Sequence, residues 1–404
     1  MDALILSAAL DTNGQNARYV KAARKHGREE SVLLALAIGN ADPAGVVGRY
    51  QSAATRHPVG LRIRSAHKTR AYFDFPTDLV WDPHDKAALR EIRQLAKDAD
   101  VIHLNNSDVA VRQFSVQRKP MLLHHHGSMF RNNPQRMLDI AASRKMVQAV
   151  STVDLREPAP ELLHWLPTAY DVKALQKFAR QNRRTEDGRI RIVHCPTNRE
   201  LKRTDLLIRV VDDLTAEGLP IDLVLVEGRT NAESLAEKAK ADIVFDQLMY
   251  GYGCNAVEAW GMGKPVISGA EPWTTAEMRK MWGDTPYAHA TEKTLKTIVR
   301  KLVTSADARA ETAAKGLEHV RRYHDELPAL ERLAELYHDA IAAKTKPRIE
   351  GKGVLFRSTK RVMTVDGVTV AFNGGTVEVK DAEVIRRLRN LQQTRPRFGV
   401  EEVA

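Results

Sequence analysis

The feature that most constrains the fold is a repeated pattern of short, continuously apolar runs that alternate with helical stretches. Residues 31–39 (SVLLALAIG) are apolar throughout, and residues 15–27 before them have helical spacing. Strands that are buried on both faces are typical of parallel sheets covered by helices on each side. The pattern predicts strands at 3–9, 31–39, 101–106, 121–127 and 145–152. We therefore expect the first part of the chain to be a doubly wound α/β domain.

The same pattern resumes after a break. Three prolines and a polar stretch (QNRRTEDGR) mark a boundary near residues 172–188. A helix is predicted at 204–218 and a long helical finish at about 292–343, with strands at 189–196, 221–228, 241–248 and 264–269. This is a second open α/β sheet. Because ligands bind beyond the carboxyl ends of such strands, two facing domains of this kind enclose a cleft.

The resulting domain organisation has five parts. We expect one Rossmann-like domain at 1–172, a second at 189–330 and a closing helix at 331–346. Beyond Pro347, apolar and polar residues alternate between DG and NGG turns, which predicts a small basic β-rich module at 350–392. Residues 393–404 are predicted to be a disordered tail.

Charge is unevenly distributed along the chain. The net charge of +11 divides into +6 for residues 1–170, −1 for 171–340 and +6 for 341–404. Basic flanks favour an acidic partner, such as nucleic acid or an anionic surface, although they also serve solubility alone.

The cysteines and apolar runs indicate the compartment. Two cysteines, Cys195 and Cys254, are too few for a disulfide framework, which favours a reducing, cytoplasmic location. The start of the chain lacks the features of a signal peptide. No apolar run approaches the roughly 20 residues of a membrane span, so we expect no transmembrane segment.

Residues 189–269 carry a resemblance to a known family. The segments HCPTNRELKRTDLLIRVV and ADIVFDQLMYGYGCNAVEAWGMGKPVISG look like the donor domain of retaining glycosyltransferases of family four. The E-A-x-x-x-G-K-P-V-I segment is the most specific part, and the chain order agrees over about residues 1–343. The resemblance implies the GT-B fold and a hexosyl or pentosyl transfer from a nucleotide-diphospho-sugar, with retention of anomeric configuration. It implies no metal and no cofactor besides the donor substrate.

Glu258 is the candidate contact to the donor's ribose. In the family this glutamate closes on the ribose, and a carboxylate can accept hydrogen bonds from both hydroxyls of a diol. A helix glutamate without a ligand is the plainer alternative. We expect its replacement by alanine to abolish turnover and weaken donor binding without unfolding the protein. The glycine-rich segment before it supplies the further candidate donor contacts Tyr252, Gly253, Cys254 and Asn255.

One residue departs from the family pattern. The family often has a second glutamate eight residues before the ribose-binding one, and this chain has Tyr250 there. A branch of the family with D-Q-L followed by G-x-Y-G fits Asp246 to Gly253 instead. The contacts to the donor sugar are therefore open, with backbone amides near Cys254 and Asn255 as candidates.

Cations between a strand end and a helix predict the diphosphate site. A diphosphate leaving group gains negative charge as its bond to the sugar breaks, so nearby cations accelerate departure. The resemblance assigns the phosphates to Arg199 and Lys202; Arg203, where the family has glycine, is a third contact or faces solvent. The turn at Asn13 and Gly14 is a weaker donor-binding candidate.

The three consecutive histidines, 124–126, allow two interpretations. Alternation along a strand places His124 and His126 on one face, which is compatible with a metal site, but no further ligand stands at suitable spacing. The family alignment instead places His126 at the strand's carboxyl end, facing the donor sugar, with His103 a weaker candidate. We therefore expect His126, Lys202 and Glu258 to be the catalytic residues and expect no metal.

Two other functions and several acceptors stay open. The alternatives to a glycosyltransferase are a nucleotide-sugar epimerase on the same scaffold and a non-catalytic nucleic-acid-binding or structural protein. The candidate acceptors are a modified DNA base, a virion or other protein, and an anionic lipid or glycan. The tail module resembles small modules of phage virion proteins, which suggests a phage-encoded protein in the host cytoplasm.

Overall fold

The structure is a computed structural model that divides into two compact units, Met1–Lys344 and Thr345–Ala404. It describes residues 33–39, 45–57, 59–67, 78–80, 82, 84–106, 109–185, 187–344, 354–358, 362–365, 368–371, 376–379, 384–385, 388–389, 392 and 400–403. The strand predicted at 3–9, the helix at 15–27 and the candidate residues Asn13 and Gly14 lie outside the described residues.

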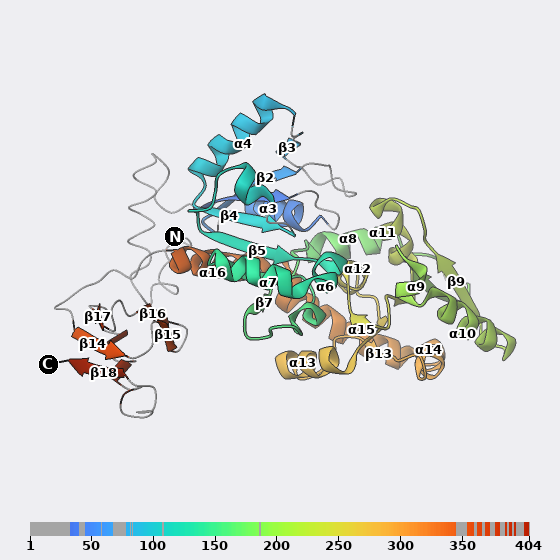
Figure 1. Cartoon of the computed structure of the whole chain (residues 1–404). Coiled ribbons are helices and arrows are strands. Elements are labelled where there is room, and N and C mark those ends of the chain that lie inside the picture. The colour runs from blue at the N-terminus through green and yellow to red at the C-terminus, as the bar shows by residue number, and fades with distance from the viewer. Residues whose placement is uncertain are drawn as a thin grey trace. The chain divides into compact units, whose positions relative to one another are not determined.

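A seven-stranded sheet forms the first domain of the larger unit (Figure 1). Its order is β3-β2-β1-β4-β5-β6-β7, and every pairing is parallel. The strands are β1 (Leu33–Gly39), β2 (Leu61–His67), β3 (Leu79–Val80), β4 (Val101–Asn105), β5 (Met121–His125), β6 (Val147–Val150) and β7 (Leu163–Trp165). The helices are α3 (Val46–Arg56), α4 (Lys86–Asp98), α5 (Val109–Gln113), α6 (Gly127–Asn132) and α7 (Pro134–Ser143), with the short turn η1 (Val153–Arg156).

Both faces of this sheet are buried, as the apolar strands predict. Along β1, Ala35 and Ala37 belong to one core cluster, whereas Leu36 and Ile38 belong to another. Successive side chains of a strand point to opposite faces, so each cluster covers one side of the sheet. The continuously apolar sequence of β1 is explained by these two cores.

A six-stranded sheet forms the second domain. The order β11-β12-β10-β8-β9, with β13 beside β12, is parallel except for β11. The strands are β8 (Ile190–His194), β9 (Ile221–Leu225), β10 (Ile243–Phe245), β11 (Tyr250–Gly251), β12 (Val266–Ala270) and β13 (Ala288–His289). The helices are α8 (Val172–Gln181), α9 (Arg199–Lys202), α10 (Thr204–Ala216), α11 (Asn231–Lys240), α12 (Cys254–Gly261), α13 (Pro272–Trp282), α14 (Leu295–Thr304) and α15 (Ala306–His319).

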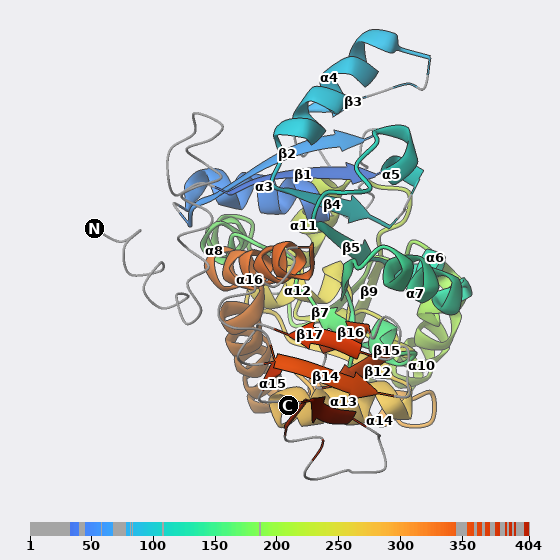
Figure 2. The ribbon, with the colours of Figure 1, turned by 60° about the vertical axis from the view of Figure 1, so that its left-hand side comes forward.

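The chain passes twice between the domains, and the two connecting segments are hydrogen-bonded to each other. The backbone N–H of Tyr170 donates to the carbonyl of His324, 2.7 Å away. A π-helical turn, η2 (Val320–His324), leads into the closing helix α16 (Glu326–Lys344). Leu333, Leu336 and Tyr337 of α16 are buried in the core of the first sheet, so the last helix returns to the first domain (Figure 2).

The close contact between α15 and α12 can be tested at Gly316 of α15. A methyl group at Gly316 would overlap the indole of Trp260 in α12. We expect Gly316→Ala to lower the free energy of unfolding by about 1–3 kcal/mol in urea denaturation, as overpacking does. In an exposed helix the same change is stabilising by about 1 kcal/mol, so a gain in stability would contradict the packing described.

The smaller unit contains two small β-sheets. A three-stranded sheet has the order β17-β14-β18, and β15 pairs with β16 as a hairpin. The strands are β14 (Val354–Ser358), β15 (Val362–Val365), β16 (Val368–Ala371), β17 (Thr376–Val379) and β18 (Val400–Val403). The expectation of disorder over 393–404 is wrong for residues 400–403, because β18 pairs with β14 and Glu402 forms an ion pair with Arg389 at 2.7 Å.

Among the helices that the structure describes, none is both long and apolar enough to cross a lipid bilayer.

Candidate functional site

A buried carboxylate organises the loops at the carboxyl ends of β8 and β10. Asp246 follows β10 directly and is fully buried. One of its oxygens accepts from the ammonium of Lys202 at 2.7 Å, and the other accepts from the backbone N–H of Gly253, also at 2.7 Å. A methyl group placed on Gly253 would lie 4.0 Å from Lys202 Nζ. The lysine is therefore held beside the glycine segment.

The N-terminus of α12 opens at the same place. Gly253 precedes the helix, and no side chain caps it. The first backbone N–H groups of a helix lack partners within the helix and attract anions. The side chain of Asn255 donates to the carbonyl of Cys195 at 2.9 Å and so ties this helix start to the end of β8. A cation and a helix N-terminus together form a site that suits phosphate oxygens.

Glu258 lies one turn further along α12, where it is 1% exposed and forms a buried ion pair. Its Oε2 accepts from Lys238 Nζ at 2.5 Å, and Oε1 accepts from Arg49 and from Asn231, each at 3.2 Å. Lys238 is completely buried in α11, and Arg49 comes from α3 of the first domain. Glu258 therefore connects the two domains as well as two helices.

Both members of this ion pair are charged. Burial by itself would raise the pKa of Glu258, but Lys238 and Arg49 outweigh burial and hold that pKa below its ordinary value. Burial would likewise lower the pKa of Lys238, but the attraction of Glu258 raises it instead. A carboxylate has about four acceptor positions, and three are in use. A contact to both ribose hydroxyls therefore requires Arg49 or Asn231 to withdraw.

Tyr252 occupies a different place from the donor contact that the motif predicts. It is 4% exposed, and its hydroxyl lies 3.0 Å from both His319 and His324. Its ring packs edge-on against Trp260. The phenol therefore holds the glycine segment against the core and is not accessible to a ligand in this structure.

Arg199 and Arg203, two cations of the predicted diphosphate site, form ion pairs with other acids. Arg199 donates to Glu227 at 2.9 and 3.1 Å and lies 3.5 Å from Asp205, so the structure does not place it in the group of Lys202 and Asp246. Arg203 forms an ion pair with Glu292 at 2.8 Å. Its φ of 57° is left-handed, which explains why glycine suits this position.

His126 stands at the carboxyl end of β5 and immediately precedes α6. Its Nε2 lies 2.6 Å from Asn105 Oδ1, and its backbone N–H donates to Asn106 Oδ1. Burial, assisted by His103 and His125, lowers its pKa to about 3, so the ring is neutral at pH 7. With Nε2 donating to the amide oxygen, Nδ1 carries the lone pair and can accept from a hydroxyl group.

His103 and His124 form a short buried chain with Tyr337. His103 lies between the hydroxyl of Tyr337, at 2.9 Å, and Nδ1 of His124, at 3.3 Å. Burial lowers the pKa of His103 to about 3. Within the described part of the chain, no group of three or more histidine, cysteine or acidic side chains is placed to hold a metal ion.

Comparison with known proteins identifies the architecture. No protein-family model matches the sequence, and no curated protein matches it. HepE from Anabaena, in complex with UDP and glucose, matches with a TM-score of 0.53 at 14% identity, over 75% of this chain and 98% of HepE. A glycosyltransferase from Rickettsia africae gives 0.51 at 10% identity, over 77% and 99% of the two chains. Sucrose-phosphate synthase from Thermosynechococcus elongatus gives 0.50 at 12% identity, over 77% and 100%.

Two Rossmann-like sheets in series, matched by glycosyltransferases over nearly their whole lengths, decide the architecture. The chain has the GT-B fold.

Contacts between the two GT-B domains bring the histidine and glycine segments near each other. The guanidinium of Arg131, in α6, lies 4.0 Å from the ring centre of Tyr250, in β11. Arg131 also pairs with Asp154 of the first domain at 2.7 Å. Tyr250 therefore packs against an arginine from the segment that follows His126.

The partners of Glu258 are the residues of this GT-B site that sequence analysis missed. Arg49 and Asn231 stand in no recognised motif. Lys238 carries one weak signal, because it lies three residues after Leu235 and directly before Ala239, both of which pack in a hydrophobic cluster. A lysine on the apolar stripe of a helix indicates a buried partner, but the sequence does not say which carboxylate it meets.

Proposed function

We propose that the protein is a glycosyltransferase that uses a nucleotide-diphospho-sugar as its donor. One observation carries the proposal: Lys202, held by buried Asp246, lies beside the uncapped N-terminus of α12, with Glu258 one turn further on. A diphosphate between the cation and the helix would leave the ribose near Glu258. The assembly lies beyond the carboxyl ends of β8 and β10, where ligands of open α/β sheets bind.

UDP-glucose is the first donor to test. HepE, which shares the GT-B fold, is seen in complex with UDP-glucose. We test the function by incubating the protein with UDP-glucose and other nucleotide-sugars and following release of the nucleoside diphosphate by mass spectrometry. Donor turnover that Lys202→Ala abolishes supports the proposal. A folded wild-type protein that neither binds nor hydrolyses any of the donors would contradict it.

Retention of configuration is the finer part of the proposal. The acceptor oxygen would bond to the anomeric carbon on the face from which the diphosphate leaves, and a leaving phosphate oxygen would take up the acceptor's proton. Neutral His126 would accept from a sugar hydroxyl through Nδ1. Lys202 and the helix N-terminus would stabilise the departing charge, so we expect activity to survive EDTA. The anomeric configuration of the product, read by NMR, tests retention.

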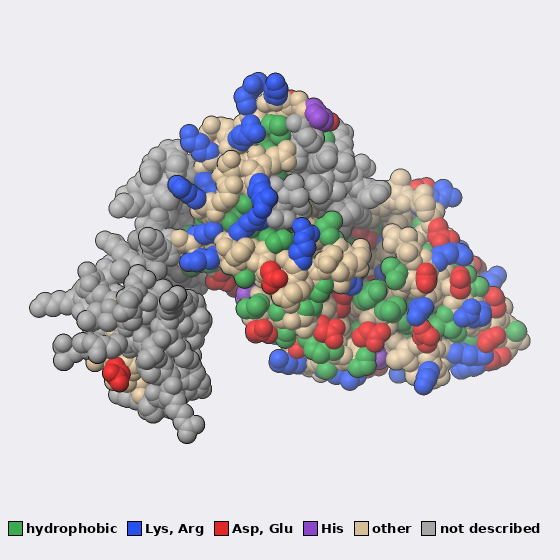
Figure 3. Space-filling view, in the orientation of Figure 1, with side chains coloured by type: hydrophobic (Ala, Val, Ile, Leu, Met, Phe, Trp, Pro, Cys, Tyr) green, Lys and Arg blue, Asp and Glu red, His purple; other side chains and the backbone are tan. Residues whose placement is uncertain are grey.

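The acceptor is proposed to be acidic. Exposed lysines and arginines of α4 gather on one face of the first domain: Lys86, Arg90, Arg93 and Lys97 (Figure 3). Residues 341–404 add a net charge of +6. Such surfaces attract polyanions. A modified DNA base and an acidic virion protein are the acceptors we favour, and a phage origin stays a prediction.

Removal of the smaller unit separates donor and acceptor functions. Because α16 ends at Lys344 and residues 345–404 form their own compact unit, a chain ending at 344 should keep donor binding. We expect it to bind duplex DNA more weakly and with less salt dependence, since each phosphate neutralised contributes roughly 0.9 to the slope of log affinity against log salt. Gel shifts at two salt concentrations measure this. Equal DNA affinity of both chains would exclude a tail-mediated nucleic-acid contact.

A further inference from the structure

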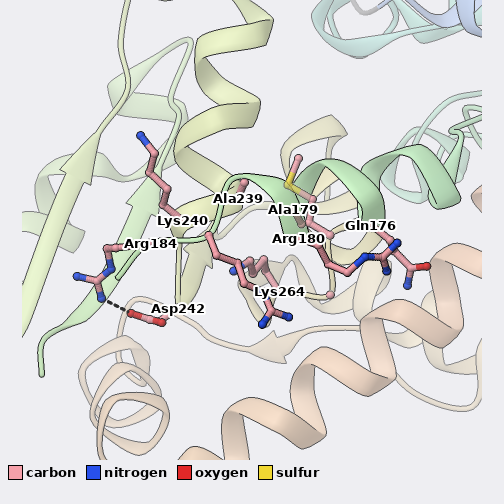
Figure 4. Close-up of a pocket in the computed structure, with 11 residues that line it drawn as sticks. Gln176, Ala179, Arg180, Arg184, Ala239, Lys240, Asp242 and Lys264 are labelled. Atoms are coloured by element: carbon pink, nitrogen blue, oxygen red, sulfur yellow. Dashed lines mark hydrogen bonds and ion pairs between the residues drawn. The ribbon is translucent and has the colours of Figure 1, made fainter. Parts of the chain in front are cut away.

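A cavity of about 430 Å³ lies apart from the candidate donor site, and we call it the basic pocket (Figure 4). Its walls come from the carboxyl-terminal parts of α8 and α11 and from the turn that follows α12. Asp242 and Lys264 of this pocket lie just before β10 and β12, at the amino ends of these strands. Asp246 and Lys202 instead lie beyond the carboxyl ends of β10 and β8. The basic pocket is therefore at the opposite edge of the sheet from Lys202.

Five cations and one carboxylate line the basic pocket: Arg180, Arg183, Arg184, Lys240, Lys264 and Asp242. Two of the cations are neutralised. Arg184 pairs with Asp242 at 2.9 Å and with Asp187 at 2.8 Å, and Lys240 pairs with Glu237 at 2.7 Å.

The other three cations form no ion pair within 4 Å among the residues that the structure describes. These are Arg180, Arg183 and Lys264. Helix ends account for part of this charge, because α8, α11 and α12 all end at the pocket and each helix C-terminus carries roughly half a negative charge. The five cations face three carboxylates, Asp242, Asp187 and Glu237, which leaves a net charge of two, and three helix ends offset about one and a half of it. A positive charge of about one half remains for a ligand.

Lys264 is influenced by charges on both sides. Burial lowers its pKa, the carboxylate of Asp242 opposes this, and the guanidinium groups of Arg183 and Arg184 lower the pKa further. Like charges held close together are costly unless an anion lies between them. The floor beneath them is apolar, since Ala179, Ala239 and Met262 form one small buried cluster. A charged rim over an apolar floor suits an ionic group attached to an organic body.

We propose that the basic pocket binds the phosphate group of a small phosphorylated molecule. Arginines present planar pairs of donors that match phosphate oxygens, and two unpaired arginines stand here with a half-buried lysine. The volume falls within the range of small-molecule sites, about 300–1,000 Å³. The proposal is independent of the glycosyltransferase activity, because none of its residues belongs to the donor site.

Calorimetric titration with inorganic pyrophosphate tests the proposal. All proteins carry Lys202→Ala, so that the candidate donor site does not contribute. The pocket variant is Arg180→Ala/Arg183→Ala, whose side chains are exposed and not needed for the core. The matched control, Arg209→Ala/Lys293→Ala, removes two exposed cations elsewhere in the same domain. Lys264→Met removes the half-buried cation from the other wall.

We expect pyrophosphate to bind at least about tenfold more weakly to the pocket variant and to Lys264→Met, and within about twofold of the parent to the control. A second arm measures sedimentation with vesicles of phosphatidylcholine, with and without an equal part of phosphatidylglycerol. Pocket-dependent pyrophosphate binding assigns a soluble phosphate, and pocket-dependent binding to the anionic vesicles alone assigns a lipid headgroup. The proposal is overturned if the pocket variant and the control behave alike in both arms.

Discussion

Glu258→Ala should lower the free energy of unfolding by about 3–5 kcal/mol, because it leaves a buried ammonium without its partner. Lys238 is completely buried, and Glu258 is the acid that it contacts, at 2.5 Å. Urea denaturation measures the loss. The sequence alone predicts only that the alanine variant stays folded; the buried ion pair adds the expectation that it is less stable than the wild type. An alanine variant of unchanged stability would contradict the buried ion pair.

A double variant separates the structural role of Glu258 from its role in donor binding. Glu258→Ala/Lys238→Met removes both charges and keeps an apolar side chain in place of the lysine, so most of the lost stability should return. Donor affinity should stay lower than in the wild type, by about 1.5–3 kcal/mol for one hydrogen bond to a charged group. Calorimetry with UDP-glucose measures it. Wild-type affinity in the folded double variant would remove Glu258 from the donor site.

Lys202→Ala has the second large expected effect, a loss of about 10²–10³ in kcat, comparable with the loss of one electrostatic donor at a developing charge. Its ammonium lies at the helix N-terminus where the proposed diphosphate departs. Binding of the nucleoside alone should hardly change, since a nucleoside carries no phosphate. Steady-state kinetics and calorimetry with uridine together measure the two effects.

Arg199→Ala is the control for Lys202→Ala. The sequence places both cations in one loop, but the structure pairs Arg199 with Glu227. We therefore expect a much smaller kinetic loss for Arg199→Ala. Equal losses for the two variants would show that Arg199 leaves Glu227 when the donor binds.

Residues near one another in the chain were the more predictable part of this site. Lys202 and Glu258 each stand in a segment whose glycines, strand end and helix start are recognisable together. The sequence also marked position 203 as unusual, because Arg203 stands where the resembled family has glycine. Its left-handed backbone explains that preference for glycine. The role of Tyr252 was less predictable, since its hydroxyl binds His319 and His324, which follow it by more than sixty residues.

The sequence by itself determined the two-sheet α/β architecture, since continuously apolar strands alternating with helices need a parallel sheet covered on both faces. It also placed Lys202 in a strand-to-helix connection and Glu258 in the helix that follows the glycine segment, because glycine and capping patterns are local. Only the tertiary structure decided which charges meet. Lys238, Arg49 and Asn231 reach Glu258 from two other helices, and Arg199 turns to Glu227. Such pairings depend on how helices pack across the sheets and between domains, and this packing cannot be deduced from the spacing of residues along the chain.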